Sequence, residues 1–349
     1  MPCPQTNTAP ATCAGVFLCN FSRKLLAMKL LFVADPLDTF KTYKDTTFAM
    51  MREAAQRGHA PSACQPRDIS WCSGQPVAAQ VCDIQLTGAT AKGAPWYTAS
   101  AARHAALRDF DAVLMRKDPP FDAEYLYATH LLGQAEREGA LVINRASALR
   151  EHPEKLAVME FQQYIAPTLV ARSAAAIRAF HAEHGDIIIK PLDGMGGMGI
   201  FRVKSDGLNL GSIIEQLGNN GATTLMAQKF LPEIAAGDKR VLIIDGETVP
   251  YALARIPQAG EVRGNLAAGG RGVAQPLSDK DRETARAIGA VLAPRGLLLI
   301  GLDIIGSSVT EINVTSPTCF QEIEQQTDCC VSALFIDALE RRGQQQRRS

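Results

Sequence analysis

The sequence predicts a fold of two classes, a parallel α/β domain followed by α+β segments built on antiparallel sheet. Apolar, strand-like runs alternate with helical patterns up to about residue 150, which is typical of parallel βαβ units. After Lys155, hairpin signals replace this alternation. The chain of 349 residues is long enough for two or three domains of ordinary size.

Residues 28–150 form the predicted N-terminal α/β domain. Its helices end at glycines, Gly58 and Gly139, which favour the end of a helix. The expected strands are Leu30–Ala34, Asp111–Met115 and Ala140–Asn144, and the expected helices are Thr47–Arg57 and Tyr125–Glu138. The stretch Trp71–Ala101 has little periodicity and many small residues, so we expect a loop or an irregular hairpin there.

Residues 151–232 and 233–340 form two predicted α+β subdomains, and 341–349 form a tail whose polar part, Gln344 to Ser349, is expected to be frayed. The first subdomain holds a glycine-rich turn between strands. In the second, Asp245-Gly246 is the signature of a tight hairpin. The expected strand pairs are Asp186–Lys190 with Ile200–Val203, Arg240–Ile244 with Glu247–Ala252, and Leu297–Ile305 with Val309–Val314.

Composition excludes several classes of function. Lys plus Arg and Asp plus Glu both number 36, so no global basic field attracts nucleic acid or an anionic membrane. No apolar run is long enough to span a bilayer. Nine cysteines occur at irregular spacing without a C-x-x-C pair, which favours reduced thiols in a cytoplasmic protein.

The first 27 residues differ from the rest. They are rich in Pro, Thr, Ala and Cys, and basic Arg23 and Lys24 follow the short apolar stretch, whereas a secretory signal places basic residues before it. Met28 directly precedes the first predicted strand. We therefore expect residues 1–27 to be a non-native or disordered leader and the native start to be Met28.

The glycine-rich turn Gly194–Gly199 formally matches G-x-G-x-x-G. A dinucleotide site requires a helix after this motif, but the alternating Ile200–Val203 predicts a strand. A P-loop is excluded because no Gly-Lys-Ser/Thr closes the run. The remaining interpretation is a strand–loop–strand that folds over phosphates, with Lys190 at the end of the first strand.

Asp303, Glu311 and Asn313 form a candidate metal site. If Gly306–Ser308 is a three-residue loop, Ile305 faces Val309 and Asp303 faces Glu311. Residues two apart on a strand share a face, so Asn313 joins the two acids. Such oxygen ligands suit Mg²⁺ held together with substrate phosphates.

Arginines add an anion-binding element. Arg240 and Arg255 lie on apolar strands, while Arg263 and Arg271 flank a Gly- and Ala-rich segment. The composition of the stretch from Ile256 to Arg271 predicts a mobile lid that excludes water.

These motifs, taken in their order along the chain, resemble those of the ATP-grasp superfamily, in which two α+β subdomains clamp ATP. Longer motifs resemble the bacterial glutathione synthetase family within it, over about Lys29 to Leu339. The motifs are Lys44–Phe48 (KDTTF), Met115–Phe121 (MRKDPPF), Lys190–Gly197 (KPLDGMGG), Asp238–Arg240 (DKR), Arg263–Arg271 (RGNLAAGGR) and Thr310–Thr318 (TEINVTSPT). The departures are the leader and the stretch from about Ser70 to Arg108.

The resemblance implies an ATP-dependent ligase that joins γ-glutamylcysteine and glycine into glutathione through an acylphosphate. It implies two Mg²⁺ ions, with Mn²⁺ as a substitute, held by Asp303, Glu311 and Asn313. Arg240 and Arg255 would be catalytic. The implied ATP-binding residues are Lys155, Lys190, Gly194, Gly196, Gly197, Gln228, Lys229, Phe230, Leu231 and Asp238.

The resemblance also implies a set of substrate-binding residues, a lid over the site and an oligomeric state. The substrate set is Thr46, Arg116, Arg263, Asn265, Ser316 and Thr318, and the lid set is Ile256, Gly264, Gly269, Gly270 and Arg271. A homo-oligomer is expected from the family. Two alternatives remain at the level of sequence: another ATP-grasp carboxylate–amine ligase, which would share the phosphate and metal residues, and a nucleotide-binding regulator without turnover.

Overall fold

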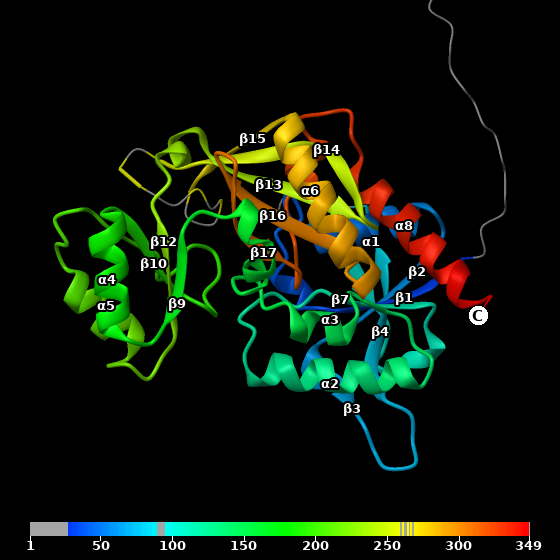
Figure 1. Cartoon of the computed structure of the whole chain (residues 1–349). Coiled ribbons are helices and arrows are strands. Elements are labelled where there is room, and N and C mark those ends of the chain that lie inside the picture. The colour runs from blue at the N-terminus through cyan, green and yellow to red at the C-terminus, as the bar shows by residue number, and fades with distance from the viewer. Residues whose placement is uncertain are drawn as a thin grey trace, which may run out of the picture.

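The computed structural model describes residues 27–88, 95–258, 260–261, 264, 266 and 269–348. Three sheets organise them, with eight, four and five strands. The four-stranded sheet and its helices form a separate lobe, shown in green at the left of Figure 1, beside the body that holds the other two sheets.

The first sheet has a parallel centre, as predicted. Its strands β2, β1, β7 and β8 lie in that order, and β1 is fully buried beyond its first residue. These strands span β1 Lys29–Val33, β2 Ala60–Cys64, β7 Ala112–Met115 and β8 Val142–Ile143, and the helices beside them are α1 Thr46–Gln56, α2 Ala123–Arg137 and α3 Ala146–Glu151. The chain leaves β1 toward one edge and β7 toward the other, so their carboxyl ends meet at a topological switch point, where ligands bind in such sheets.

The stretch predicted as loop or irregular hairpin contains a nine-residue strand, β4 (Ala78–Leu86). It pairs antiparallel with β2 and with three short strands, so this sheet is mixed. These are β3 Ile69–Ser70, β5 Tyr97–Ala99 and β6 Arg103–Ala106. The loop alternative is wrong for β4, whereas its antiparallel pairing with β5 and β6 agrees with an irregular hairpin. The exposed residues Gln80, Asp83 and Gln85 do not follow a period of two, which hid the strand in the sequence.

The second sheet carries the glycine-rich turn. Its strand order is β11-β10-β12-β9, all antiparallel, and α4 and α5 pack on it around Ile187 and Ile189. The elements are β9 Thr168–Ala171, α4 Ala174–His184, β10 Ile187–Pro191, β11 Phe201–Val203, α5 Leu210–Gly218 and β12 Leu225–Lys229. A strand follows the turn, which confirms the strand–loop–strand prediction.

The third sheet is also antiparallel, in the order β15-β14-β13-β16-β17. The Asp245-Gly246 hairpin is confirmed, with positive φ angles of 53° and 85° at its two turn residues. The elements are β13 Asp238–Ile244, β14 Glu247–Ile256, β15 Arg271–Pro276, α6 Asp279–Leu292, β16 Leu299–Ile305 and β17 Ser308–Asn313.

The tip of the β16–β17 hairpin differs from the prediction. Ile305 pairs with Ser308 and Ile304 with Val309, so the turn is shorter by one residue than expected. The register then shifts, and Asp303 still pairs with Glu311. Thr310 is the extra residue of this bulge, and its hydroxyl donates to the carbonyl oxygen of Asp303 at 3.2 Å. The bulge offsets the shorter turn, which is why the predicted pair of acids is correct.

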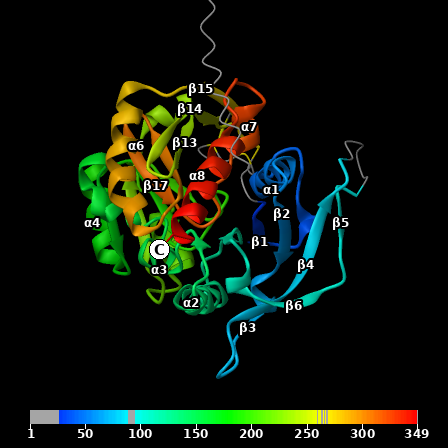
Figure 2. The same cartoon turned by 90° about the vertical axis from the view of Figure 1, so that its right-hand side faces the viewer.

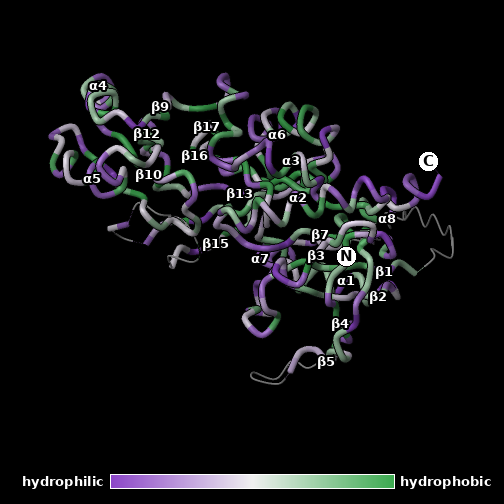
Figure 3. The backbone as a smooth tube through the Cα atoms, turned by 90° about the horizontal axis from the view of Figure 1, so that it is seen from below, coloured by the Kyte–Doolittle hydropathy of each residue, from purple (hydrophilic) through white to green (hydrophobic). Residues whose placement is uncertain are grey.

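The C-terminal helix α8 (Val331–Gln346) packs against α1 of the first sheet, as Figure 2 shows together with α7 (Phe320–Glu324). The prediction of a frayed tail from residue 344 is therefore wrong for residues 344–346, which belong to α8. Arg342 pairs with Asp245 at 2.6 Å, and Gly343 lies against the side chain of Met28. The last turns are nevertheless hydrophilic (Figure 3), which explains the prediction.

Short 3₁₀ helices connect the larger elements: η1 Leu37–Thr39, η2 Pro66–Asp68, η3 Leu107–Asp109, η4 Ala157–Tyr164, η5 Pro232–Ala236 and η7 Ala293–Arg295. Among the residues described, no helix has the length and apolarity to cross a membrane. The predicted leader, residues 1–26 of it, lies outside the described residues. The division into domains stays a prediction.

Candidate active site

A cavity of about 450 Å³ is lined by residues of the second and third sheets, of α1 and of loops, including the loop that follows β7 of the first sheet. Every described residue predicted to act in catalysis or to bind ATP, metal or substrate lines it. These are Thr46, Arg116, Lys155, Lys190, Gly194, Gly196, Gly197, Gln228, Lys229, Phe230, Leu231, Asp238, Arg240, Arg255, Asp303, Glu311, Asn313, Ser316 and Thr318.

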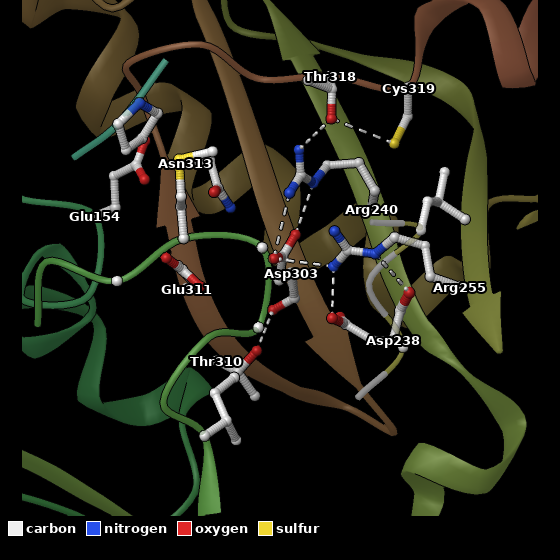
Figure 4. A pocket seen from close by; sticks show the side chains of 18 of the residues that line it. Glu154, Asp238, Arg240, Arg255, Asp303, Thr310, Glu311, Asn313, Thr318 and Cys319 are labelled. Carbon is white, nitrogen blue, oxygen red and sulfur yellow. Dashed lines mark hydrogen bonds and ion pairs between the residues drawn. The ribbon is translucent and has the colours of Figure 1, made fainter. Parts of the chain in front are cut away.

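A buried network of ion pairs forms one wall (Figure 4). Nε of Arg240 lies 2.6 Å from Oδ1 of Asp303, and Nη2 of Arg255 lies 2.9 Å from Oδ2 of the same carboxylate. Arg255 also binds Oδ2 of Asp238 at 2.5 Å. These contacts follow from the sheet, because Arg240 is opposite Asp303 and Asp238 opposite Arg255 in neighbouring strands.

The network sets the protonation of its acids. Burial alone would raise the pKa of Asp303, but the guanidinium groups of Arg240 and Arg255 outweigh it and hold that pKa well below its usual range. Burial raises the pKa of Asp238 to about 6, against the attraction of Arg255 and with the repulsion of Asp303. Asp303 is therefore the permanent negative charge of this wall.

The two lysines predicted to hold phosphates converge on the metal hairpin. Nζ of Lys155 donates to the carbonyl oxygen of Gly194 at 2.5 Å and lies 3.2 Å from Oε1 of Glu311. Nζ of Lys190 donates to the carbonyl oxygen of Thr310 at 3.3 Å. Burial lowers the pKa of Lys190, and Glu311 partly opposes that shift.

The candidate metal ligands fit a hard divalent cation. The carboxylates of Asp303 and Glu311 come from paired residues of adjacent strands. Nδ2 of Asn313 donates to the carbonyl oxygen of Gly301 at 3.1 Å, which leaves the amide oxygen to serve as a ligand. The described residues hold no group of three or more His, Cys, Asp or Glu with metal-site geometry, so the set depends on this amide as its third ligand.

The predicted substrate residues hold the first sheet against the segment that follows β17. Nε of Arg116 donates to the hydroxyl of Thr47 at 3.1 Å, and its Nη2 donates to the carbonyl oxygen of Pro317 at 3.0 Å. The hydroxyl of Thr46 accepts from the backbone N–H of Phe320 at 3.4 Å. Burial lowers the pKa of Arg116. Thr46 and Arg116 thus close the cavity at the switch point of the first sheet.

The lid segment begins and ends on paired strands, since Ile256 is opposite Arg271 in the β14–β15 pair. Gly264 lines the cavity, and a side chain there would clash with the carbonyl oxygen of Arg255. The carbonyl oxygen of Gly269 accepts from the side chain of Gln258 at 2.8 Å. Arg263 and Asn265 lie outside the described residues, and a closing motion of the lid stays a prediction.

Sequence reasoning missed Glu154, which also lines the cavity. Its Oε1 accepts from the backbone N–H groups of Val314 and Thr315 at 3.0 Å each and from the hydroxyl of Thr315 at 2.6 Å. Its carbonyl oxygen accepts from Ile312. Glu154 therefore braces the strand of Glu311 and Asn313. Its position beside Lys155 was a signal, but its partners lie some 160 residues away.

Sequence reasoning also missed Lys44 and Glu322, which line the cavity near Thr46. Lys44 lies in one of the motifs that resemble the family, but sequence reasoning assigned it no role. Glu322 gave no signal in the sequence, because nothing local distinguishes it from a surface acid. On the opposite side, Arg202 stacks over the ring of Phe230, with its guanidinium carbon 3.6 Å from the ring centroid, and so supports the cavity wall there.

The fold and the cavity define an ATP-grasp ligase. Two solved structures share the fold: a D-cycloserine synthetase (TM-score 0.65, 17% identity, 90% of this chain and 99% of that one) and the ATP-grasp ligase PsnB with minimal precursor, Mg and ADP (TM-score 0.57, 20% identity, 90% and 98%). At the level of sequence the match is closer.

The chain belongs to the prokaryotic glutathione synthetase family. Residues 28–150 match its N-terminal domain and residues 154–328 its ATP-grasp domain. The glutathione synthetase of Ralstonia nicotianae is 58% identical over 90% of this chain and 96% of its own length. That of Neisseria meningitidis serogroup A is 56% identical over 89% and 98%. The predicted family, fold class and ATP-dependent ligase activity are thereby confirmed, and the family implies a divalent metal.

Proposed function

We propose that the protein joins γ-glutamylcysteine to glycine and converts ATP to ADP and phosphate in the same reaction, which yields glutathione. The observation that carries the assignment of roles is the contact of Lys155 with both Gly194 and Glu311. It brings the glycine-rich loop, a phosphate-binding cation and a metal-binding acid to one point of the cavity. Phosphoryl transfer needs this neutralisation and alignment more than a nucleophile on the protein.

The first step transfers the γ-phosphoryl group to the cysteinyl carboxylate, which forms an acylphosphate and releases ADP. Lys155, Lys190 and the backbone of Gly194 to Gly197 hold the phosphates. Two Mg²⁺ ions, or Mn²⁺, bound by Asp303, Glu311 and Asn313 would neutralise phosphate charge. Gln228 to Leu231 and Asp238 contact the nucleoside part of ATP.

In the second step, the glycine amine attacks the acyl carbon, the amine loses a proton, and phosphate leaves. Arg240 and Arg255 stabilise the negative charge of the acylphosphate and of the tetrahedral intermediate. Asp303 holds both guanidinium groups in place before substrate arrives. The lid keeps water from the acylphosphate, and Arg263, Asn265, Ser316 and Thr318 bind substrate carboxylates.

Phosphate release from ATP tests this function, with γ-glutamylcysteine and glycine added separately and together. Release that requires both supports the proposal. Release with many amino acids in place of glycine would assign another carboxylate–amine ligase, and no release under any condition would sink the proposal.

We also propose a cytoplasmic location and a homo-oligomer. The six cysteines within the described residues are free thiols, which fits a reducing compartment. Size-exclusion chromatography with light scattering measures the oligomeric state, and a monomer at working concentration contradicts the second part.

A further inference from the structure

Within the described residues, two acids of the cavity have a buried carboxylate oxygen without a hydrogen-bond partner, Asp238 and Glu322. The other oxygen of Asp238 pairs with Arg255, whereas Glu322 forms no ion pair there. Its side chain lines the cavity, and its Oε2 is buried without a hydrogen-bond partner among the residues described. An unsatisfied buried acceptor of this kind lowers the stability of the folded protein. Such a cost is tolerated where a ligand later supplies the missing donor.

The other acids lining the cavity have partners or water. Asp303 and Asp238 pair with arginine, and Glu311 pairs with Lys155. Asp45 caps α1 through Phe48, and Glu154 accepts from Val314 and Thr315. The carboxylate of Asp118 has no partner among the described residues but is exposed, so water satisfies it. Of the half-buried acids that line the cavity in the described part of the chain, Glu322 is thus the one whose carboxylate has no hydrogen-bond or ion-pair partner on another residue.

The position of Glu322 favours one part of the substrate. It lies on α7, which packs against α1, the helix that begins at Thr46. Burial raises its pKa, while the charges of Lys44 and Arg240 lower it. Lys44 also lines the cavity and forms no ion pair among the described residues. An anion and a free cation side by side complement an amino-acid head group, which carries one ammonium and one carboxylate.

We propose that Glu322 is the subsite for the α-ammonium of the γ-glutamyl group, with Lys44 beside it for the α-carboxylate. This inference rests on the proposed function. The other end of the dipeptide, its cysteinyl carboxylate, must face the Arg240–Asp303 wall, where phosphoryl transfer takes place. The γ-glutamyl end then extends toward α1, where Glu322 lies.

The test compares two substrates, γ-glutamylcysteine and N-glutarylcysteine, which lacks only the amino group. Phosphate release is measured with saturating ATP and glycine. We expect the wild-type protein to prefer the amino substrate by about 100-fold in kcat/KM. When the analogue binds instead, the carboxylate of Glu322 is enclosed without a positive partner, which weakens binding. In Glu322→Gln the preference is expected to fall below about tenfold, through the KM for γ-glutamylcysteine, with the KM values for glycine and ATP unchanged.

Asp118→Asn is the matched control, since Asp118 is the other cavity acid without a protein partner. It is expected to keep the wild-type preference. Glu322→Gln should also keep or raise the melting temperature, because it neutralises an unpaired buried charge. A lower melting temperature would instead assign Glu322 a structural role and overturn the inference.

Three kinetic outcomes also overturn it: a preference that Glu322→Gln retains, a preference that Asp118→Asn removes, and a raised KM for glycine in Glu322→Gln. The last would assign Glu322 to the incoming amine. If the wild-type protein ligates neither substrate to glycine, the proposed function fails and the inference with it. If it ligates γ-glutamylcysteine but shows no preference over the analogue, the inference fails alone.

Discussion

Two walls of the cavity carry charges in different arrangements. The paired wall is built from β13, β14, β16 and β17, and the second wall from α1 and the loop after β7. On the first, Arg240, Arg255 and Asp303 are buried and neutralise one another. On the second, Lys41 and Asp118 are exposed and Lys44 is half-buried, without ion pairs among the described residues. The first wall is ordered before substrate arrives, as electrostatic stabilisation of a transition state requires. On the second wall, we expect Lys44 to gain its partner only when substrate binds.

The largest expected effect is that of Asp303→Asn on the paired wall. Arg240 and Arg255 lose their shared counter-charge and a metal ligand is removed. We expect turnover to fall by about 10³-fold and the free energy of unfolding to fall by about 3 kcal/mol. Phosphate release measures turnover, and urea denaturation measures the free energy of unfolding.

Asp281→Asn is the matched control for that variant. Asp281 is a buried acid paired with Lys239 at 2.6 Å, away from the cavity. It is expected to lose comparable stability but to keep turnover. If both variants lose turnover equally, the effect of Asp303→Asn is one of stability and the paired wall has no special role.

Glu154→Ala tests whether the paired wall depends on its brace. The variant leaves the backbone N–H groups of Val314 and Thr315 without an acceptor. We expect kcat/KM to fall about 50-fold and the Mg²⁺ concentration for half-activation to rise, because Glu311 and Asn313 lose their fixed position. Glu154→Gln keeps the accepting oxygen and is expected to remain within about threefold of wild type. Equal losses in both variants would contradict a bracing role.

Lys44→Ala tests the second wall. A half-buried charge without a protein partner contributes little to stability, so the melting temperature should stay constant. The KM for γ-glutamylcysteine is expected to rise about tenfold, with the KM for ATP unchanged. Lys280→Ala, at an exposed site of α6, should change neither. A drop in melting temperature for Lys44→Ala would show that the second wall is also held by its own charges.

The smallest effect concerns pH and stability alone. The pKa of Asp238 is raised to about 6 in the folded protein, so the folded state binds more protons than the unfolded state between about pH 4 and pH 6. Stability therefore falls as pH rises through this window. Asp238→Asn is expected to flatten that slope, measured as the melting temperature at pH 4.5 and 6.5. An unchanged slope would show that the pH dependence comes from other buried acids. Glu154 is one such acid, because burial raises its pKa as well.

Sequence reasoning located the paired wall well, because its residues are set by local periodicity. The alternation along β16 and β17 places Asp303 and Glu311 on one face, and the glycine-rich turn shows that a strand follows rather than a helix. It failed at the tip of the β16–β17 hairpin, because the spacing of residues along the sequence does not reveal the bulge at Thr310. It also missed β4, because a strand with one solvated face lacks a continuous apolar run.

By itself the sequence determined the fold class and the family, since these depend on residue type and on short spacings, and it predicted the metal and phosphate residues from the same features. The tertiary structure alone decided which distant residues complete the site. Glu154 reaches Thr315, Arg116 reaches Pro317, and α8 returns to cover the sheet that begins at Met28. The physical reason is that such contacts are set by how sheets and helices pack in three dimensions. Neither propensity nor periodicity carries that information along the chain.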